Sequence, residues 1–291
     1  MAEIDAGETS ARVLRYPGSK WGLARQIVSL MPEHVRYLEP FLGSGAAFFT
    51  KPRAAFETVN DLDGEVFNLF SLLRDERLRE QLVEAVEFTA YAEDELLSLR
   101  DALATDDPVE RARRLLVRSW QDFAGLRPHG DSMTFRWAGS GTQTERPAHV
   151  WARLPERISA AARRLKDAQV LRRDAVEVIE AHRDPRVLVY ADPPYLRSTR
   201  TEDYYAHETD DAFHERLLGA LLRHPGPVLL SGHASALYED ALAGWERTEL
   251  LGRRQGMRRG RKGYEDTEIV WRNPAASGHA GDPMRPLFDA G

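Results

Sequence analysis

Residues 187–195 place chemically useful side chains directly after an apolar run. The run Val-Leu-Val-Tyr-Ala is typical of a buried strand, and it ends in Asp192-Pro193-Pro194-Tyr195. Because two prolines cannot continue a strand ladder, they predict a stiff turn at the carboxyl end of the strand, where open α/β sheets bind ligands. Asp192 supplies a hydrogen-bond acceptor and Tyr195 an aromatic face, which together suit a flat substrate with an exocyclic amine. The alternative is a strand that ends in a Pro-Pro turn with an incidental aspartate.

A glycine-containing loop follows an earlier predicted strand. Residues 39–45 read Glu-Pro-Phe-Leu-Gly-Ser-Gly, a strand end, a loop and a helix start that let the backbone approach a nucleotide closely. Asp61 ends the next predicted strand, where a carboxylate can accept hydrogen bonds from ribose hydroxyls. Phe48 stands where a dinucleotide fingerprint has its third glycine, so S-adenosylmethionine, which has no pyrophosphate, fits better than NAD. For the loop alone, an ordinary βα turn is the alternative.

Two other segments offer groups that could contact a cofactor. Residues 15–20 (Arg-Tyr-Pro-Gly-Ser-Lys) precede a predicted helix, where backbone donors and Lys20 could hold a carboxylate. Taken alone, this segment favours a helix-capping turn. Asp174 follows a short predicted strand, where it could accept a hydrogen bond from an adenine amine, cap the following helix, or do both.

The net charge of −6 conceals a basic segment. Between Gly252 and Gly263 lie six basic residues, Arg253, Arg254, Arg258, Arg259, Arg261 and Lys262. A basic loop beside a substrate cleft suits a phosphate backbone, and a solvated loop is the alternative, although inert surfaces usually mix both signs. Four arginines on a predicted helix either extend the basic face or are simply solvated: Arg111, Arg113, Arg114 and Arg118.

Composition excludes several classes of protein. The 291 residues contain no cysteine, which excludes disulfides, thiolate metal sites and a cysteine nucleophile. No apolar run has membrane-spanning length and no histidine spacing indicates a metal site, while the acidic N-terminus does not resemble a signal peptide. We therefore expect a cytoplasmic protein that binds neither membrane nor metal.

Apolar spacing predicts the order of the elements. Helices are expected over 22–31, 46–50, 64–74, 150–166, 175–182 and 211–223, with helical spacing over 75–122, and strands over 35–39, 54–60, 170–171, 187–191, 228–231 and 267–271. This alternation predicts a Rossmann-like, doubly wound parallel α/β sheet in residues 11–75 and 166–273. A mostly helical insertion with a glycine-rich loop or hairpin occupies 76–165, and residues 1–10 and 274–291 are expected to be flexible tails. Four tryptophans are expected in the core: Trp120, Trp137, Trp151 and Trp245.

From about residue 14 to 272 the motifs occur in a familiar order, and the chain resembles the Dam-like adenine-specific DNA methyltransferases. Residues 15–20 look like that family's cofactor-methionine motif, 39–45 its glycine loop, 60–63 its ribose motif and 192–195 its catalytic signature. Later segments, residues 228–233 and 268–270, also look similar. Residues 118–147 depart from the Asn- and Tyr-rich recognition hairpin of well-known members, so the target sequence is not carried over.

The resemblance implies methyl transfer from S-adenosylmethionine to the exocyclic amine of an adenine in double-stranded DNA. It assigns cofactor binding to Tyr16, Lys20, Glu39, Phe41, Gly43, Gly45, Asp61 and Asp174, and catalysis to Asp192, Pro193, Pro194 and Tyr195. Asp192 and the Pro193 carbonyl would accept the two amine N–H groups, and Tyr195 would stack on a base that has left the duplex. The insertion would recognise the target and the basic loop would contact phosphates.

Three alternatives stay open at this point. The same turn could serve the exocyclic amine of cytosine, or RNA, whereas carbon-5 methylation of cytosine is excluded because the chain has no cysteine. An NAD-dependent oxidoreductase is disfavoured by the missing third glycine, and a catalytically idle DNA-binding protein by the intact Asp192 and Lys20. The oligomeric state is open, and a monomer on DNA is compatible with the sequence.

Overall fold

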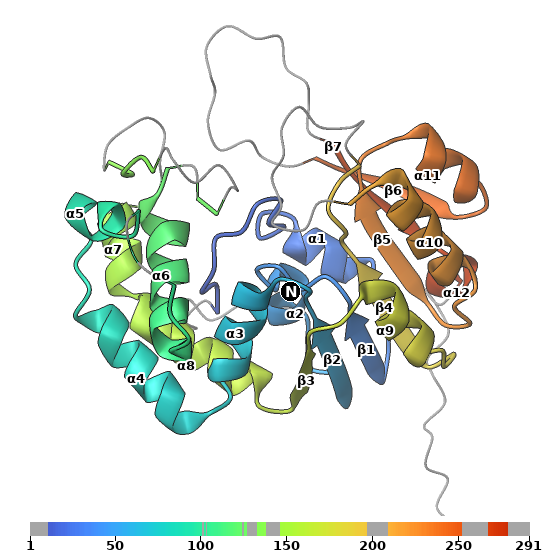
Figure 1. Ribbon diagram of the computed structural model, residues 1–291. Coiled ribbons are helices and arrows are strands. Elements are labelled where there is room, and N and C mark those ends of the chain that lie inside the picture. Colours follow the sequence, from blue (N-terminus) through green and yellow to red (C-terminus); the bar gives the residue numbers. More distant parts are fainter. Residues whose placement is uncertain are drawn as a thin grey trace, which may run out of the picture.

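One mixed sheet organises the described residues of the computed structural model (11–100, 102, 104–123, 125–126, 133–137, 146–196, 209–251 and 267–278). Its seven strands there are β1 (Arg36–Glu39), β2 (Phe56–Asn60), β3 (Ala168–Leu171), β4 (Val187–Ala191), β5 (Val228–Gly232), β6 (Glu246–Leu251) and β7 (Thr267–Arg272). In space they run β3-β2-β1-β4-β5-β7-β6 (Figure 1). This arrangement confirms the predicted doubly wound α/β fold. The parallel strands β1 and β4 lie side by side in the middle, β2 and β3 follow on one side of them, and β5 follows on the other side.

One edge of the sheet differs from the prediction. β7 runs antiparallel to both β5 and β6, so the sheet is mixed and the expectation of a purely parallel sheet was wrong there. β6 was not predicted, because its sequence Glu-Arg-Thr-Glu-Leu-Leu lacks a clear apolar alternation and only Leu250 is buried. Charged side chains on an edge strand discourage pairing with other chains. The same charged residues break the apolar alternation by which a strand is recognised in the sequence.

Helices cover both faces of the sheet and continue into the insertion. They are α1 (Ala24–Ser29), α2 (Ala46–Thr50), α3 (Gly64–Leu72), α4 (Glu76–Glu87), α5 (Glu93–Leu97), α6 (Pro108–Gln121), α7 (Pro147–Ala152), α8 (Leu154–Leu165), α9 (Ala175–Ala181), α10 (Asp211–Leu222), α11 (Ala236–Ala241) and α12 (Pro274–Ser277). Alternate residues of β4 supply two cores: Leu188 and Tyr190 pack toward α1–α3, and Val189 toward α9–α11. The sheet therefore holds the ends of its strands rigidly between two layers.

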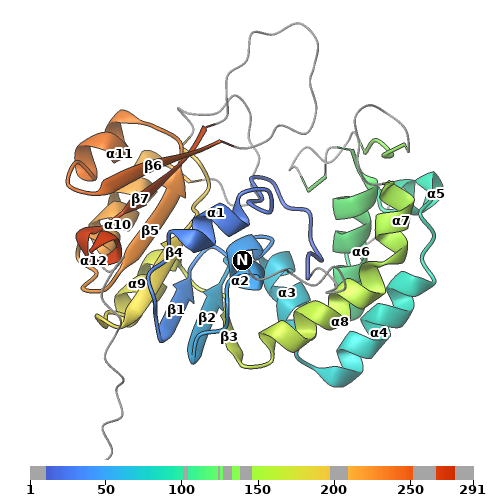
Figure 2. The ribbon, with the colours of Figure 1, turned by 180° about the vertical axis from the view of Figure 1, so that it is seen from behind.

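The insertion forms a helical lobe beside the sheet. The two opposite views agree that α4–α8 gather on one side and α9–α12 on the other (Figures 1 and 2). The predicted helical stretch 75–122 is divided into α4, α5 and α6, and Asp75 and Asp107 cap the first and last of these by accepting backbone N–H groups. Leu116 and Ile158 share one apolar core with Val13 and α3, so the lobe is packed firmly against the part of the chain that forms the sheet.

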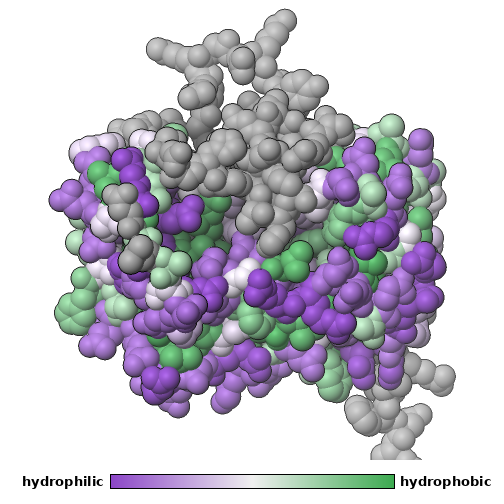
Figure 3. All heavy atoms as spheres, viewed as in Figure 1, coloured by the Kyte–Doolittle hydropathy of each residue, from purple (hydrophilic) through white to green (hydrophobic). Residues whose placement is uncertain are grey.

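Several peripheral expectations can be compared with the structure. Ala276 is buried in α12, so ordered chain extends past the predicted end at residue 273. Trp120 and Trp151 are buried and Trp245 is partly buried, but Trp137 is 63% exposed and does not belong to the core. No helix among the described residues is long and apolar enough to cross a membrane. Hydrophilic residues cover most of the face in Figure 3, with smaller apolar patches between them.

Candidate active site

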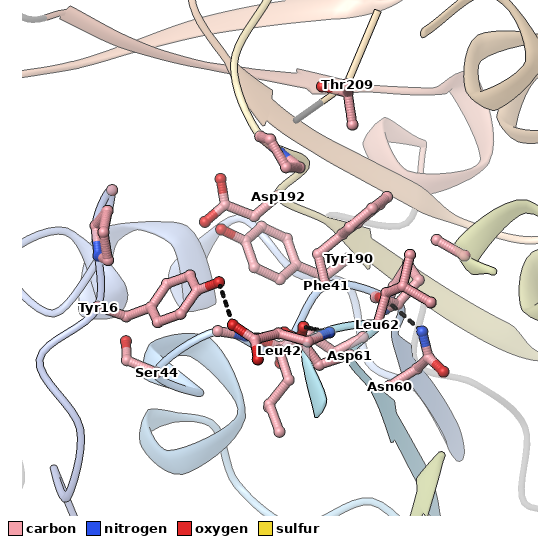
Figure 4. A pocket seen from close by; sticks show the side chains of 18 of the residues that line it. Tyr16, Phe41, Leu42, Ser44, Asn60, Asp61, Leu62, Tyr190, Asp192 and Thr209 are labelled. Atoms are coloured by element: carbon pink, nitrogen blue, oxygen red, sulfur yellow. Dashed lines mark hydrogen bonds between the residues drawn. The ribbon is translucent and has the colours of Figure 1, made fainter. Parts of the chain in front are cut away.

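A cavity of about 670 Å³ opens at the carboxyl ends of the parallel strands. Its walls come from the residues that follow β1, β2, β3 and β4 and from the N-terminal segment before α1 (Figure 4). Seven of the predicted cofactor residues line it: Tyr16, Lys20, Glu39, Phe41, Gly43, Asp61 and Asp174. Asp192 and Pro194 line the same space, so the glycine loop and the Asp-Pro-Pro-Tyr turn share one cavity of a size typical for small-molecule sites.

The glycine loop bends sharply between β1 and α2. Gly43 and Gly45 have φ of 48° and 69°, in the left-handed region that side chains strain. A Cβ on Gly45 would lie 2.6 Å from the Phe49 ring, whereas one on Gly43 would lie 3.2 Å from the Tyr16 ring. Gly45 is not among the residues that line the cavity. In this structure its role is to make the turn and pack against Phe49, while Gly43 keeps the backbone open beside the cavity.

Asp61 attaches the glycine loop to the end of β2. Its two carboxylate oxygens accept hydrogen bonds from the Gly43 N–H at 2.7 Å and the Asp63 N–H at 2.9 Å. Burial raises the pKa of Asp61 to about 6, although both hydrogen bonds act to lower it. Asp61 is therefore mostly ionised at neutral pH, and a carboxylate with about four acceptor directions can still receive ribose hydroxyls.

Two neighbours of Asp61 complete this corner. The Asn60 side-chain amide donates to the carbonyls of Pro40 and Arg173, both at 3.0 Å, and its oxygen accepts from the Arg173 N–H. Asn60 therefore ties the strand ends of β1, β2 and β3 together. Asp63 caps α3 and accepts from the Tyr16 hydroxyl at 3.4 Å (Figure 4). These contacts were not predicted, because an Asn-Asp-Leu-Asp sequence does not reveal which distant carbonyls it will face.

The N-terminal segment docks onto the glycine loop. The Ser19 and Ser44 hydroxyls are hydrogen-bonded at 2.8 Å, which holds the segment across the start of α2. Lys20 was predicted to meet a cofactor carboxylate. In the structure its ammonium lies 2.8 Å from Asp192 Oδ1 and donates to the Gly18 carbonyl at 3.0 Å. Lys20 thus borders both the cavity and the Asp-Pro-Pro-Tyr turn.

A buried charge cluster supports the Asp-Pro-Pro-Tyr turn. The Lys20 ammonium donates to the Tyr195 hydroxyl at 2.7 Å, and that hydroxyl donates to Glu268 Oε2 at 2.7 Å. Burial raises the pKa of Asp192 against the lowering effect of Lys20. Burial alone would lower the pKa of Lys20, but Asp192 and Glu268 raise it well above its ordinary value. The ammonium therefore stays charged beside two carboxyl groups.

The Tyr195 ring is held on two sides. The Lys20 ammonium lies 4.7 Å from its centroid and the His233 ring lies 4.1 Å away with a 50° tilt. Tyr195 does not line the cavity, and neither does Pro193, whereas Pro194 does. The structure places all four predicted catalytic residues in the irregular segment that directly follows β4, and of these only Asp192 and Pro194 line the cavity.

Glu39 at the end of β1 has a carboxyl group that, unlike that of Asp61, is mainly protonated at neutral pH. It is 2% exposed, and it accepts a hydrogen bond from the Tyr37 hydroxyl at 2.6 Å. Burial raises the pKa of Glu39 to about 8, although the Tyr37 hydrogen bond lowers it. At neutral pH this side chain is therefore mainly protonated, and it can donate a hydrogen bond into the cavity.

The cavity also has walls that the sequence did not reveal. Phe213 of α10 meets Phe41 edge-on with ring centroids 6.2 Å apart, and Leu62 is 45% exposed at the cavity wall. Asp174 caps α9, as one of its two predicted roles, and lies 4.0 Å from Arg216 of α10. Phe213 and Arg216 share the face of α10 that their spacing of three residues predicts, but nothing in the sequence indicates that this face reaches the cavity. The predicted DNA-binding residues Arg253, Arg254, Arg258, Arg259, Arg261 and Lys262 lie outside the described residues.

Comparison with known proteins agrees with this arrangement. A family model described as D12 class N6 adenine-specific DNA methyltransferase matches residues 16–253. A "DNA N-6-adenine-methyltransferase" of Escherichia phage P1 is 26% identical over 262 residues, covering 86% of this chain and 33% of the relative. The "Type II methyltransferase M1.LlaDCHI" of Lactococcus lactis subsp. cremoris is 29% identical over 205 residues, covering 67% of this chain and 69% of the relative. The chain thus spans about a third of the phage relative and about two thirds of the lactococcal one.

Proposed function

Because the chain belongs to the D12 class of N6 adenine-specific DNA methyltransferases, we propose that it methylates the exocyclic amine of an adenine in double-stranded DNA, with S-adenosylmethionine as the methyl donor. The observation that carries the proposal is the shared cavity. The glycine loop and Asp61 lie at one part of it and Asp192 at another, so a cofactor and a target amine can meet in one space.

The lining of the cavity fits S-adenosylmethionine by its chemistry. Phe41, Phe213 and Leu62 offer apolar contact for a purine, and Asp61 offers acceptors for a ribose diol. The open Gly43 backbone also lines the cavity, and so do Ser19 and Ser44, which are hydrogen-bonded to each other. Ser19 directly precedes Lys20, and polar groups there suit the amino-acid end of the cofactor. Asp174 could accept from the adenine amine of the cofactor while it caps α9. When bound, the cofactor supplies an activated methyl group, so the protein mainly has to position the two reactants.

Asp192 is the residue to which we assign the target amine. The amine lone pair is delocalised into the purine ring, and acceptors for its N–H groups localise it on nitrogen. Asp192 is partly buried, with 19% of its side chain exposed. It is held by Lys20 and faces the cavity, while the Pro193 carbonyl is the second acceptor we propose. The ring of Tyr195 is in contact with His233 and Lys20, so its stacking on a flipped base stays a prediction.

A cluster of arginines supports a DNA-recognition role for the insertion. The guanidinium groups of Arg12, Arg15 and Arg157 lie 5.6, 5.9 and 5.6 Å from the ring centroid of Trp120. Burial, followed by repulsion from Arg136 and Arg12, lowers the pKa of Arg15 to about 10. Positive charges held this close together favour the binding of an anion. Arg15 directly precedes Tyr16, which lines the cavity.

Exposed aromatic residues accompany these arginines. Residues 121–123 and 134–136 are joined by backbone hydrogen bonds around an antiparallel bridge between Asp122 and Phe135. The next residue, Trp137, is 63% exposed and packs edge-on against Phe135. Positive charge beside an exposed aromatic ring is the combination that holds phosphates and stacks on bases. We therefore propose that DNA lies over Arg15, Arg136 and Trp137 as well as over the predicted basic loop.

Salt dependence of DNA binding tests this surface. Each lost phosphate contact should reduce the slope of log affinity against log salt by about 0.9. We expect a reduced slope both for Arg136→Ala and for the triple replacement of Arg258, Arg259 and Arg261 by Ala. Arg153→Ala, in an exposed pair with Glu156, is the control and should leave the slope unchanged. An unchanged slope in both test variants would show that DNA binds to another surface of the protein.

Methyl incorporation tests the function itself. The protein is incubated with labelled S-adenosylmethionine and duplex DNA of random sequence, and the DNA is digested to nucleosides for mass spectrometry. We expect N6-methyladenine in the wild type and none in Asp192→Ala. N4-methylcytosine, or label only in RNA, would favour those alternatives, and cofactor and DNA binding without any methyl product would indicate a non-catalytic protein.

A further inference from the structure

Glu268 is a buried carboxylate behind the catalytic turn to which the proposed reaction gives no part. It lies near the start of β7, 4% exposed, and its Oε2 accepts from the Tyr195 hydroxyl at 2.7 Å. Its Oε1 lies 3.6 Å from the Lys20 ammonium and has no hydrogen-bond partner among the described residues. A buried charged group normally has all its hydrogen bonds satisfied, so this arrangement calls for a functional explanation.

The charges around Glu268 do not balance when both carboxylates are ionised. Lys20 is the only cation in salt-bridge contact with Asp192 or Glu268 among the described residues, so the pair shares one positive charge. The other titratable groups whose charges act on this cluster are Tyr195 of the turn, Glu39 of β1, Tyr190 of β4, His233 after β5 and Tyr238 of α11. Two negative charges with one positive charge in a buried site favour uptake of a proton by one carboxylate.

Glu268 is the carboxylate that takes up this proton near neutral pH. Burial raises its pKa to about 7 against the lowering effect of Lys20, and the negative Asp192 raises it further. Asp192 is also held at 2.8 Å by Lys20, whereas Glu268 is 3.6 Å from the same ammonium. Because coupling between two sites is reciprocal, an ionised Glu268 must make Asp192 a stronger base by the same amount.

We propose that Glu268 is a positioning residue that controls how strongly Lys20 neutralises Asp192. With Glu268 ionised, Lys20 divides its charge between two carboxylates, and Asp192 keeps more of its basicity for the target amine. With Glu268 protonated, Lys20 pairs with Asp192 alone and Asp192 becomes a poorer acceptor. In both states the Tyr195 hydroxyl stays anchored to β7, which holds the turn in place. The inference rests on the proposed role of Asp192 in accepting the amine N–H groups.

Glu268→Gln imitates the protonated state at every pH. The amide oxygen can still accept from Tyr195, but the negative charge is gone. At saturating DNA and cofactor, we expect the wild-type methyl-transfer rate to rise through pH 7 and the variant rate to stay flat. The two rates should converge near pH 6 and differ on the order of tenfold near pH 8, less than the 10²–10⁴-fold loss expected for removing a general base. A constant ratio of the two rates at all pH values would overturn the proposal.

Glu249→Gln is the matched control. Glu249 lies on β6, which pairs with β7, but it is 54% exposed and contacts Arg247 instead of the cavity. Its removal takes one carboxylate from the neighbouring strand, so we expect the wild-type pH profile. Thermal unfolding and the Kd for S-adenosylmethionine should be similar in all three proteins, which separates an effect on Asp192 from a loss of fold.

Carbon-13 NMR of the cofactor-free protein tests the coupling without activity. With carboxyl-labelled glutamate, the resonance absent from Glu268→Gln is assigned to Glu268, and we expect it to titrate near pH 7. In Asp192→Asn the same resonance should titrate at lower pH, since the neighbouring negative charge is gone. An unshifted titration would overturn the proposal. If Asp192→Asn stays fully active, the assigned role of Asp192 fails instead, whatever Glu268 does.

Discussion

Asp61 and Asp192 follow β2 and β4, the two strands on either side of β1, but the chain holds them in opposite ways. Both are aspartates at the carboxyl ends of parallel strands, both line one cavity, and burial raises the pKa of both. Asp61 is held by the backbone N–H groups of Gly43 and Asp63, which lie within eighteen residues of it. Asp192 is held by Lys20, which precedes it by 172 residues, and through Lys20 by Glu268.

This difference in partners matches the different roles that we propose for the two aspartates, cofactor binding for Asp61 and catalysis for Asp192. Backbone donors cannot change their charge, so the carboxylate of Asp61 stays in a fixed environment that suits binding. The partners of Asp192 are themselves ionisable, so the basicity of Asp192 depends on their protonation. Replacing each aspartate should therefore affect different steps.

Asp192→Ala should have the largest effect. We expect a loss of methyl transfer on the order of 10³-fold, because the amine loses its acceptor. The fold should survive, because Glu268 still gives the buried Lys20 a negative partner. Single-turnover incorporation of labelled methyl groups measures the rate, and calorimetry measures cofactor affinity, which we expect to be nearly unchanged. A rate within tenfold of the wild-type rate would contradict the catalytic role of Asp192.

Asp61→Ala should act mainly on binding. Loss of the charge-assisted hydrogen bonds to ribose should weaken S-adenosylmethionine binding by roughly 1.5–3 kcal/mol. The variant also frees the Gly43 and Asp63 N–H groups, so Asp61→Asn, which keeps one acceptor oxygen, should show a smaller loss. Asp75→Ala removes the cap of α4 instead and should leave the Kd unchanged. An unaltered Kd in Asp61→Ala would contradict the ribose assignment.

The pH dependence of cofactor binding tests the proposed role of Asp61 in a second way. Asp61 has a pKa of about 6 and binds ribose as a carboxylate, so affinity should fall as pH drops through 6. At pH 5 only about a tenth of the molecules keep the ionised form, which predicts a roughly tenfold weaker apparent Kd than at pH 7.5. Titration calorimetry of the wild type and Asp61→Asn checks this, and only the wild type should respond. Equal responses would assign the titration to another group.

The contrast also explains which features the sequence predicts. The apolar strand 187–191 and its Pro-Pro turn predict the position of Asp192, and the loop 39–45 with Asp61 predicts the cofactor corner, because both signals are local. β6 was missed because an edge strand needs few buried residues. Glu268 and Phe213 were not predicted as parts of the site because their contacts with Tyr195 and Phe41 join residues far apart in the sequence. A carboxylate at a strand start has no local feature that indicates a distant hydroxyl.

Glu39→Gln should have the smallest effect on methyl transfer, because a glutamine keeps both a donor and an acceptor at the cavity wall, and its main effect should be on stability. Glu39 and Glu57 lie on adjacent strands, but their pKa values are about 8 and about 2. Burial raises the pKa of Glu39 above its ordinary value near 4.5, so its contribution to stability is complete below pH 4.5 and is lost as pH rises through 8. A glutamine stays neutral and can still accept from Tyr37. The variant should therefore gain stability over the wild type between pH 5 and pH 8. The gain is at most about 4 kcal/mol, because the limit is about 1.4 kcal/mol for each of the three pH units.

Glu57→Gln is the control, because its effect on stability should change with pH in the opposite direction. Burial would raise the pKa of Glu57, but hydrogen bonds from Arg164 and Lys51 lower it, so its contribution is present above pH 4.5 and is lost as pH falls toward 2. Its replacement should destabilise the protein most at neutral pH and least in acid, since Lys51 and Arg164 lose their common partner. Urea denaturation of the three proteins from pH 2.5 to pH 8 measures both differences. Parallel pH profiles for the two variants would show that burial next to the cavity does not keep Glu39 protonated.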